Sequence, residues 1–281
     1  MSFRADAHMH LFEHGFGHSL AGRPGVNIDE VACYESLRQS HDVGHALVVG
    51  YAGEPFAAGN NAFLAELVKT RSWVKPVAFV DLADPLNRET LERFESEGFV
   101  GVSMYVFNDE DVATIAATSD QVWQRLVERR ALISVNSKGK CWSAWLPVLE
   151  RHPKLRLLVS HLGLPPQVSQ PPDEVTAQAV MAPVLALAAF DQVHVKLSGF
   201  YAISDPGFDY PHEASWPYVY ALLKAFGSGR LLWASDFSPH LDMLSFPQTF
   251  GLFEEMPFLN DNDCRFIEGD NLKRLLGECV G

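Results

Sequence analysis

Eight short apolar runs recur at regular intervals along this chain of 281 residues, and they limit its fold more than any other feature. The runs are too short for core helices and carry residues typical of strands, and turn-forming residues bound them, so each predicts a β-strand. The runs span residues 3–12, 45–52, 74–82, 99–106, 131–137, 155–163, 193–200 and 230–237.

Segments with helical patterns lie between these runs. Amphipathic stretches begin near Asp29 and Asn60, which are residue types that favour helix N-termini. Strands that alternate with helices form parallel sheets buried on both faces, which explains why the runs are almost continuously apolar. Further helical patterns cover residues 87–97, 120–130, 142–152, 174–190, 215–226, 247–256 and 261–276.

Eight strand–helix units in a chain of this length predict a single-domain (β/α)8 TIM barrel over residues 1–281, because about 250 residues is typical of that fold. A doubly wound open sheet is the alternative. It is disfavoured because no glycine-rich fingerprint follows any of the predicted strands.

The composition limits partners and location. With 47% hydrophobic residues the chain can bury a large core, and its net charge of −13 argues against nucleic acid and anionic membranes as partners. We see no signal peptide and no apolar stretch of membrane-spanning length, and the four cysteines lack zinc-finger or redox spacing. These features predict a cytoplasmic protein with reduced thiols that acts on a small molecule, and they leave the oligomeric state open.

Three polar sites at strand ends form a candidate metal centre. The segment Asp6-Ala7-His8-Met9-His10 places His8 and His10 on one face of the first strand, His161 closes the sixth run and Asp236 closes the eighth. Active sites of TIM barrels lie at the carboxyl ends of the strands, where these side chains fall. Their nitrogen and oxygen donors suit Zn²⁺, Mn²⁺ or a similar ion.

These motifs, taken in order, resemble the amidohydrolase-related family of TIM-barrel metal-dependent hydrolases, and within it the sugar-lactone and pyrone-dicarboxylate lactonases. The resemblance implies that His8, His10, His161 and Asp236 surround a metal site and that Asp236 also transfers protons. Because some relatives use histidines alone to polarise the carbonyl, it implies a divalent metal (Zn or Mn) or none. The matching segments are Asp6–His10, Ser160–Gly163, Val195–Gly199, Trp233–Asp236 and the closing Gly269–Gly277.

The chemistry of lactone opening fits this set of residues. A lactone carbonyl needs an electrophile on its oxygen and a nucleophile activated near neutral pH, and a metal with a bound water supplies both. Asp236 would take the water's proton and return it to the leaving alkoxide, with His161 as the second catalytic residue. We therefore expect a hydrolase that opens a lactone or related cyclic ester of a small sugar acid or carboxylate.

Two alternatives stay open at this point. One is a metal-dependent, non-oxidative decarboxylase of an unsaturated or aromatic acid, and the other is a degenerate barrel that binds a ligand without catalysis. A serine nucleophile is disfavoured because the pattern Gly-x-Ser-x-Gly is absent.

Six further residues are predicted to bind the substrate. Lysines near the barrel mouth would hold a carboxylate or hydroxyl-rich ligand in an otherwise acidic protein. No arginine follows the segment His161–Gly163, where related lactonases often carry one, and this puts a dicarboxylate substrate in doubt. The predicted substrate-binding residues are Lys138, Lys140, Lys196, Tyr105, Tyr201 and His240.

Overall fold

The computed structural model describes residues 4–17, 29–84 and 86–279. Phe3, where the first predicted run starts, lies outside them. Eight parallel strands pair in sequence order, so the predicted TIM barrel is confirmed and the doubly wound sheet is excluded. The strands are β1 (Arg4–Met9), β2 (Val43–Val49), β3 (Val74–Phe79), β4 (Gly101–Val106), β5 (Leu132–Ser137), β6 (Arg156–Val159), β7 (Val193–Leu197) and β8 (Leu231–Trp233).

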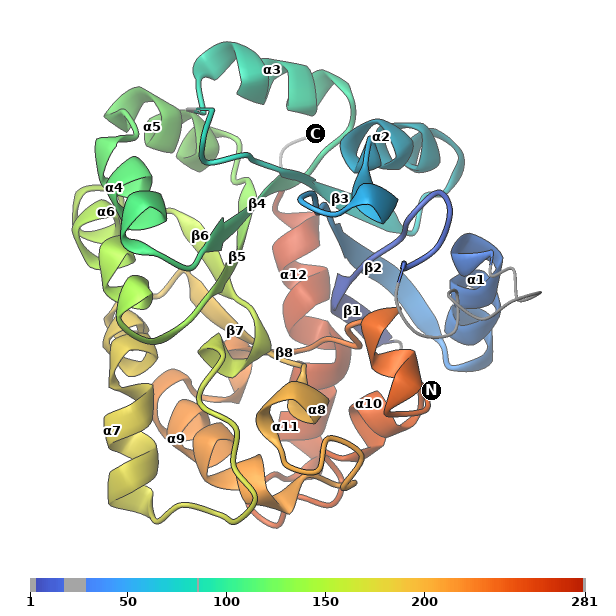
Figure 1. Cartoon of the computed structure of the whole chain (residues 1–281), viewed down its shortest axis with the longest axis vertical. Coiled ribbons are helices and arrows are strands. Elements are labelled where there is room, and N and C mark those ends of the chain that lie inside the picture. Colours follow the sequence, from blue (N-terminus) through green and yellow to red (C-terminus); the bar gives the residue numbers. More distant parts are fainter. Residues whose placement is uncertain (1–3, 18–28, 85, 280–281) are drawn as a thin grey trace.

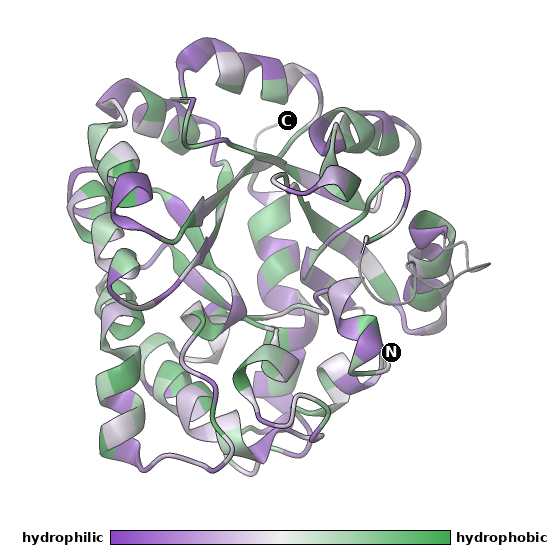
Figure 2. Ribbon diagram, in the orientation of Figure 1, coloured by the Kyte–Doolittle hydropathy of each residue, from purple (hydrophilic) through white to green (hydrophobic). Residues whose placement is uncertain are grey.

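Helices surround the strands (Figure 1). The helices near the rim, such as α3 and α5, carry both hydrophilic and hydrophobic residues (Figure 2), as expected for elements with one face in water. Within the described residues no helix is both long and apolar enough to cross a membrane. The helices are α1 (Glu30–Ser40), α2 (Asn60–Thr70), α3 (Arg88–Ser96), α4 (Asp109–Ala117), α5 (Asp120–Glu128), α6 (Trp145–Arg151), α7 (Glu174–Leu185), α8 (Phe200–Ile203), α9 (Trp216–Phe226), α10 (Gln248–Gly251), α11 (Asp261–Arg265) and α12 (Asn271–Gly277).

The structure differs from the predicted helices at several places. The short α8 was not expected. Helix α4 was not expected either. It starts with a capping box, in which Asn108 accepts a bond from the Asp111 N–H (2.9 Å) and the Asp111 carboxylate accepts one from the Asn108 N–H (3.2 Å). The helical pattern over 261–276 is divided into α11, a π-helical turn (Phe266–Asp270) and α12. The capping box of α4 is an end signal that the periodicity of apolar residues does not contain.

Two layers of side chains fill the barrel interior. The lower layer is apolar, and Leu272 and Leu275 of α12 pack against it, so α12 closes the amino-terminal end of the barrel. The upper layer, toward the carboxyl ends, is polar and includes the buried Ser134, Ser160 and Lys196. The inner apolar residues are Ala5, Ala7, Leu47, Val49, Val77, Leu132, Leu158, Leu232 and Ala234.

A buried carboxylate helps to close the barrel between β1 and β8. Asp6 accepts hydrogen bonds from the Ser235 N–H (2.9 Å), the Ser235 hydroxyl (2.5 Å), the Tyr34 hydroxyl (2.9 Å) and the His8 N–H (3.2 Å). Main-chain bonds continue the closure above it, since the Asp236 N–H donates to the His8 carbonyl at 2.8 Å. Burial raises the pKa of Asp6 to about 6, although these four bonds oppose that rise.

Replacing Asp6 by alanine is expected to lower the free energy of unfolding by about 3 kcal/mol, because it leaves buried donors on three residues without an acceptor. Urea denaturation followed by circular dichroism measures the loss. Asp109→Ala is the control, since that carboxylate is exposed and its one ion pair among the described residues is with the exposed Lys140. Equal urea midpoints for the two variants would contradict this role of Asp6.

Candidate active site

Side chains from β1, β6 and β8 meet at the carboxyl end of the barrel. The His8 Nε2 atom lies 3.1 Å from His10 Nε2 and 3.8 Å from Asp236 Oδ1, and His10 Nε2 lies 3.9 Å from the same oxygen. The His161 Nδ1 atom lies 3.9 Å from Asp236 Oδ2. The structure therefore brings together the four residues predicted to form the metal centre.

Unusual backbone conformations aim these side chains at one point. The register of β1 is irregular between Asp6 and Met9, so Ala7 packs into the inner core while the adjacent His8 turns toward the site. Both His161 (φ 52°) and Asp236 (φ 57°) adopt left-handed conformations that cost energy for residues other than glycine. Such strain, where a strand passes into its loop, is typical of functional sites.

Glycine is required at position 199, in the loop that supports His161. Gly199 has a φ of +69°, and a Cβ atom there would lie 2.9 Å from His161 Nδ1. The preceding Ser198 places its Oγ atom 2.9 Å from the same nitrogen. The segment Val195–Gly199 therefore orients the His161 ring.

All three imidazoles are held neutral by their surroundings. Burial lowers the pKa of His8 well below its usual value, and Lys196 adds to this. Burial also lowers the pKa of His10 and His161, although Asp236 opposes it in both cases. Neutral imidazoles are the form that binds metals or donates one hydrogen bond to a substrate.

Lys196 lies beneath His8 rather than in the pocket above it. Its Nζ atom is fully buried, donates to Ser134 Oγ at 2.6 Å and lies 3.1 Å from His8 Nδ1. Burial lowers the pKa of Lys196 to about 7, against the attraction of Asp6 and Asp236. Lys196 therefore acts on the site through His8, and the structure does not place it in contact with substrate.

Tyr201, on α8, holds Asp236 in place. Its hydroxyl donates to Asp236 Oδ2 at 2.6 Å. Burial and the nearby carboxylate raise the pKa of Tyr201 well above its usual value, so the hydroxyl keeps its proton. Tyr201 was predicted to bind substrate, and in the structure it contacts Asp236, the candidate catalytic residue.

A pocket of about 260 Å³ opens above these residues. Aromatic side chains form most of its wall, and Tyr51 and Tyr105 meet there with ring centres 5.3 Å apart. Tyr105 therefore lies where the sequence predicted it. The remaining lining residues are His10, Phe12, Phe16, Glu54, Phe56, Asn136, His161, Asp236 and Pro239.

Several of these lining residues were not predicted. Tyr51 and Asn136 each lie at the carboxyl end of a predicted strand, and that position is the signal that could have identified them. Phe16 and Phe56 come from loops, and they meet only because those loops fold together, with ring centres 5.1 Å apart.

Among the described residues, Tyr105 is the one predicted substrate-binding residue that lines the pocket. Tyr201 contacts Asp236, Lys196 lies beneath His8, and the other three lie outside the pocket. Lys138 places its Nζ atom 5.8 Å from the centre of the Phe107 ring, and the largely exposed Lys140 pairs with Asp109 at 2.8 Å. The 3₁₀ turn Gly139–Ala144 buries Cys141 and Trp142 and leaves both lysines outside. His240 is fully buried among aromatic residues, and its main-chain N–H donates to the Asp236 main-chain carbonyl at 3.2 Å.

The residues at the centre fit a divalent metal ion. Ligand atoms about 2.1 Å from a tetrahedral zinc ion lie about 3.4 Å from one another, close to the spacings among His8, His10 and Asp236. One ligand atom each from His8, His161 and Asp236 also lie within 4.8 Å of one another. The Nδ1 atom of His10 lies 2.8 Å from the Val49 carbonyl oxygen. A histidine that binds a metal through one nitrogen usually makes a hydrogen bond of this kind with the other.

A family model described as Amidohydrolase matches residues 5–277. The chain belongs to the amidohydrolase family. The L-fucono-1,5-lactonase of Burkholderia ambifaria is 36% identical to this amidohydrolase over 93 residues, which are 33% of this chain. The match spans 30% of that relative's length.

Solved structures share the fold of this amidohydrolase. An amidohydrolase from Burkholderia multivorans with bound HEPES is 20% identical and has a TM-score of 0.80 over 98% of this chain and 99% of the other. Another structure of an amidohydrolase from that organism contains bound zinc, with 20% identity, the same coverage and a TM-score of 0.79. A structure from Pseudomonas putida, provisionally assigned as a 2-pyrone-4,6-dicarboxylic acid hydrolase, is 22% identical with a TM-score of 0.70 over 99% of this chain and 98% of the other.

The burial of Lys196 predicts a specific dependence of stability on pH. The pKa of this lysine is about 7 in the folded protein and near 10.5 when unfolded, so the unfolded chain binds more protons between these values and stability rises with pH. Lys196→Met is therefore expected to raise the free energy of unfolding by ~2 kcal/mol at pH 7, after the lost hydrogen bonds are counted.

Denaturation of the wild type and Lys196→Met at pH 7, 8, 9 and 10 tests this dependence. The difference between them is expected to shrink as the pH rises, whereas Lys140→Met, at an exposed lysine, is expected to show no such trend. A constant difference across this range would mean that Lys196 keeps its usual pKa when folded.

Proposed function

We propose that this amidohydrolase hydrolyses the lactone ring of a small, uncharged, hydroxyl-rich sugar lactone. The observation that carries the proposal is the composition of the pocket above Asp236. Its described lining includes aromatic rings and the amide of Asn136, with no lysine or arginine. Its charged carboxylates are those of Glu54 and Asp236.

Charge favours a neutral substrate over a dicarboxylate. A substrate carboxylate buried in this pocket would meet two carboxylates and, in the described lining, no lysine or arginine. The pKa values of the lining histidines His10 and His161 are lowered, so they do not supply the missing positive charge, and such an unpaired charge is costly. The net charge of −13 adds repulsion at longer range. Lys138 and Lys140 lie outside the pocket and Lys196 lies below His8, so none of the three offsets this repulsion.

The shape and surface of the pocket suit a monosaccharide. Tyr51 and Tyr105 offer ring faces or edges to the apolar C–H groups of a sugar, while Asn136 and Glu54 offer polar groups to its hydroxyls. The name of the Burkholderia ambifaria relative, a fuconolactonase, agrees with this substrate class. A non-oxidative decarboxylase gains no support, since the described lining offers no lysine or arginine to the acid that it would bind.

The proposed reaction uses Asp236 as the proton carrier. Asp236, oriented by Tyr201, takes a proton from a water molecule as the water oxygen bonds to the lactone carbonyl carbon. The bond between that carbon and the ring oxygen then breaks, and Asp236 returns the proton to this oxygen. His10 and His161, which line the pocket, face the carbonyl oxygen.

A divalent metal held by His8, His10, His161 and Asp236 would polarise the carbonyl and lower the pKa of the attacking water. Without it, neutral imidazole N–H groups remain as donors to the carbonyl oxygen. Both routes need the same proton transfer by Asp236.

A lactone panel tests the substrate class. Sugar 1,5- and 1,4-lactones are expected to be hydrolysed with a kcat/KM at least about 100-fold above that for 2-pyrone-4,6-dicarboxylate, because an unpaired charge costs several kcal/mol. Base consumption measured with a pH indicator, with and without added Zn²⁺, Mn²⁺ or chelator, gives the rates. Asp236→Asn is the inactive control, and a preference for the dicarboxylate or release of carbon dioxide would contradict the proposal.

Replacing Tyr201 by phenylalanine tests how Asp236 is oriented. On the best lactone, kcat is expected to fall about tenfold while KM changes little, because the lost hydrogen bond holds a group that acts in the transition state. Tyr210→Phe, in the same segment between β7 and α9, is the matched control and should keep full activity. A rise in KM alone would instead mean that Tyr201 binds the substrate.

A further inference from the structure

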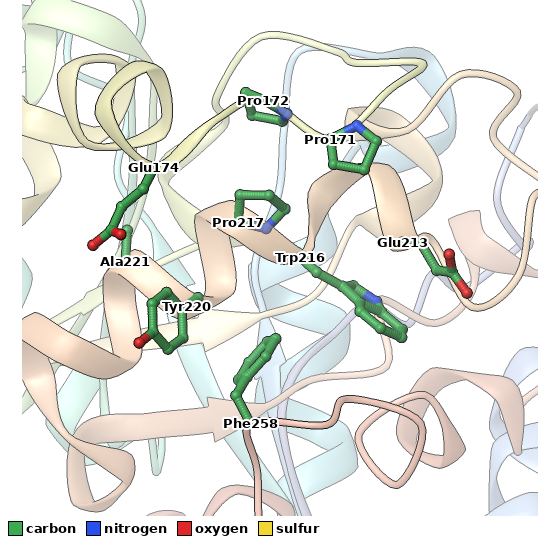
Figure 3. Close-up of a pocket in the computed structure, with 9 residues that line it drawn as sticks. All are labelled: Pro171, Pro172, Glu174, Glu213, Trp216, Pro217, Tyr220, Ala221 and Phe258. Carbon is green, nitrogen blue, oxygen red and sulfur yellow. The ribbon is translucent and has the colours of Figure 1, made fainter.

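A second pocket, with a volume of about 430 Å³, lies apart from the active site (Figure 3). It forms between the loop that leads into α7, the first turns of α9 and the segment around Phe258. It shares no lining residue with the pocket above Asp236. The reaction proposed above does not use it.

Three aromatic rings form one wall of this second pocket. The ring centre of Phe258 lies 6.4 Å from that of Trp216 and 5.4 Å from that of Tyr220, both in edge-to-face arrangements. The indole N–H of Trp216 donates to the Pro211 carbonyl at 3.1 Å, which fixes the ring. In Figure 3 prolines lie across from these rings, so the pocket surface is largely apolar.

The charged groups that line this pocket are two glutamates. Glu174 and Glu213 lie on opposite sides of the aromatic rings (Figure 3), both side chains are exposed, and no described lysine or arginine lines the pocket. Within the described residues neither carboxylate forms an ion pair; Glu174 accepts a bond from Gln178 at 3.1 Å. The Nζ atom of Lys224, a residue outside the described lining, lies 5.6 Å from the centre of the Tyr220 ring.

We propose that the second pocket binds a small organic cation with apolar substituents, of the quaternary ammonium class. Aromatic faces attract cations through the ring quadrupole, and methyl groups on nitrogen can pack on rings and prolines without losing hydrogen bonds. The two carboxylates add attraction from opposite sides. A bare metal ion does not fit, because the surface between the carboxylates is carbon rather than oxygen.

Choline and its uncharged isostere 3,3-dimethylbutan-1-ol separate cation recognition from simple apolar binding. The probe is the ¹⁵N indole signal of Trp216, assigned by its loss in Trp216→Phe. Choline is expected to shift this signal at millimolar concentration, and the isostere is expected to bind at least about fivefold more weakly. Equal binding of the two compounds, or no shift with choline, would overturn the proposal.

Charge removal provides the second arm of the experiment. Glu174→Gln combined with Glu213→Gln is expected to weaken choline binding about fivefold and to leave the isostere unchanged. Glu110→Gln combined with Glu150→Gln, at exposed glutamates of α4 and α6, is the matched control. An unchanged affinity in the first double variant would overturn the role of the carboxylates.

The active-site pocket is also aromatic, so the cation's position has to be established. If choline competes with the lactone while the Trp216 signal stays unchanged, the cation binds above Asp236 and the proposal is wrong. Because the indole signal reports binding without turnover, the titrations with choline and its isostere do not depend on the proposed lactonase activity.

Discussion

The carboxylate of Asp6 is the interaction on which the active site depends. Three elements meet on it, since Tyr34 belongs to α1, His8 to β1 and Ser235 to the segment after β8. A carboxylate accepts two hydrogen bonds on each oxygen, and so it can satisfy donors that an irregular strand leaves without a partner. Its place at the junction of the first and last strands fixes how near His8 and Asp236 come to one another.

The site built on this junction is stabilised by a polar layer inside the barrel. Ser134 and Ser160 follow Leu132 and Leu158 of the apolar inner cluster by two residues, and together with Lys196 they support the imidazole of His8. Burying a lysine at this position lowers the free energy of unfolding, and the left-handed backbone at His161 and Asp236 lowers it further. The large apolar core around the barrel offsets both, so that neutral histidines and a carboxylate stay close together in a fixed geometry.

The two pockets of this amidohydrolase use aromatic residues with different charged partners. Above Asp236, aromatic rings lie around the candidate catalytic groups, which is the basis for proposing a neutral, ring-shaped ligand. In the second pocket, two glutamates flank Trp216, Tyr220 and Phe258, and the proposed ligand there is a cation. The proposal for the first pocket rests on the distribution of basic residues, since the described lysines near the barrel mouth pair with Asp109, lie against Phe107 or are buried under His8.

The sequence by itself determined the barrel and the common location of His8, His161 and Asp236. Apolar periodicity is a local property, and the parallel topology it implies brings all carboxyl ends to one edge. Only the tertiary structure decided what these residues contact. Asp6 and Ser235 are 229 positions apart, and the rings of Phe16 and Phe56 meet through loops whose conformations have no periodic signal. The lysines after β5 point away from the pocket because a 3₁₀ turn buries Trp142 there, and such a turn depends on the core that receives it.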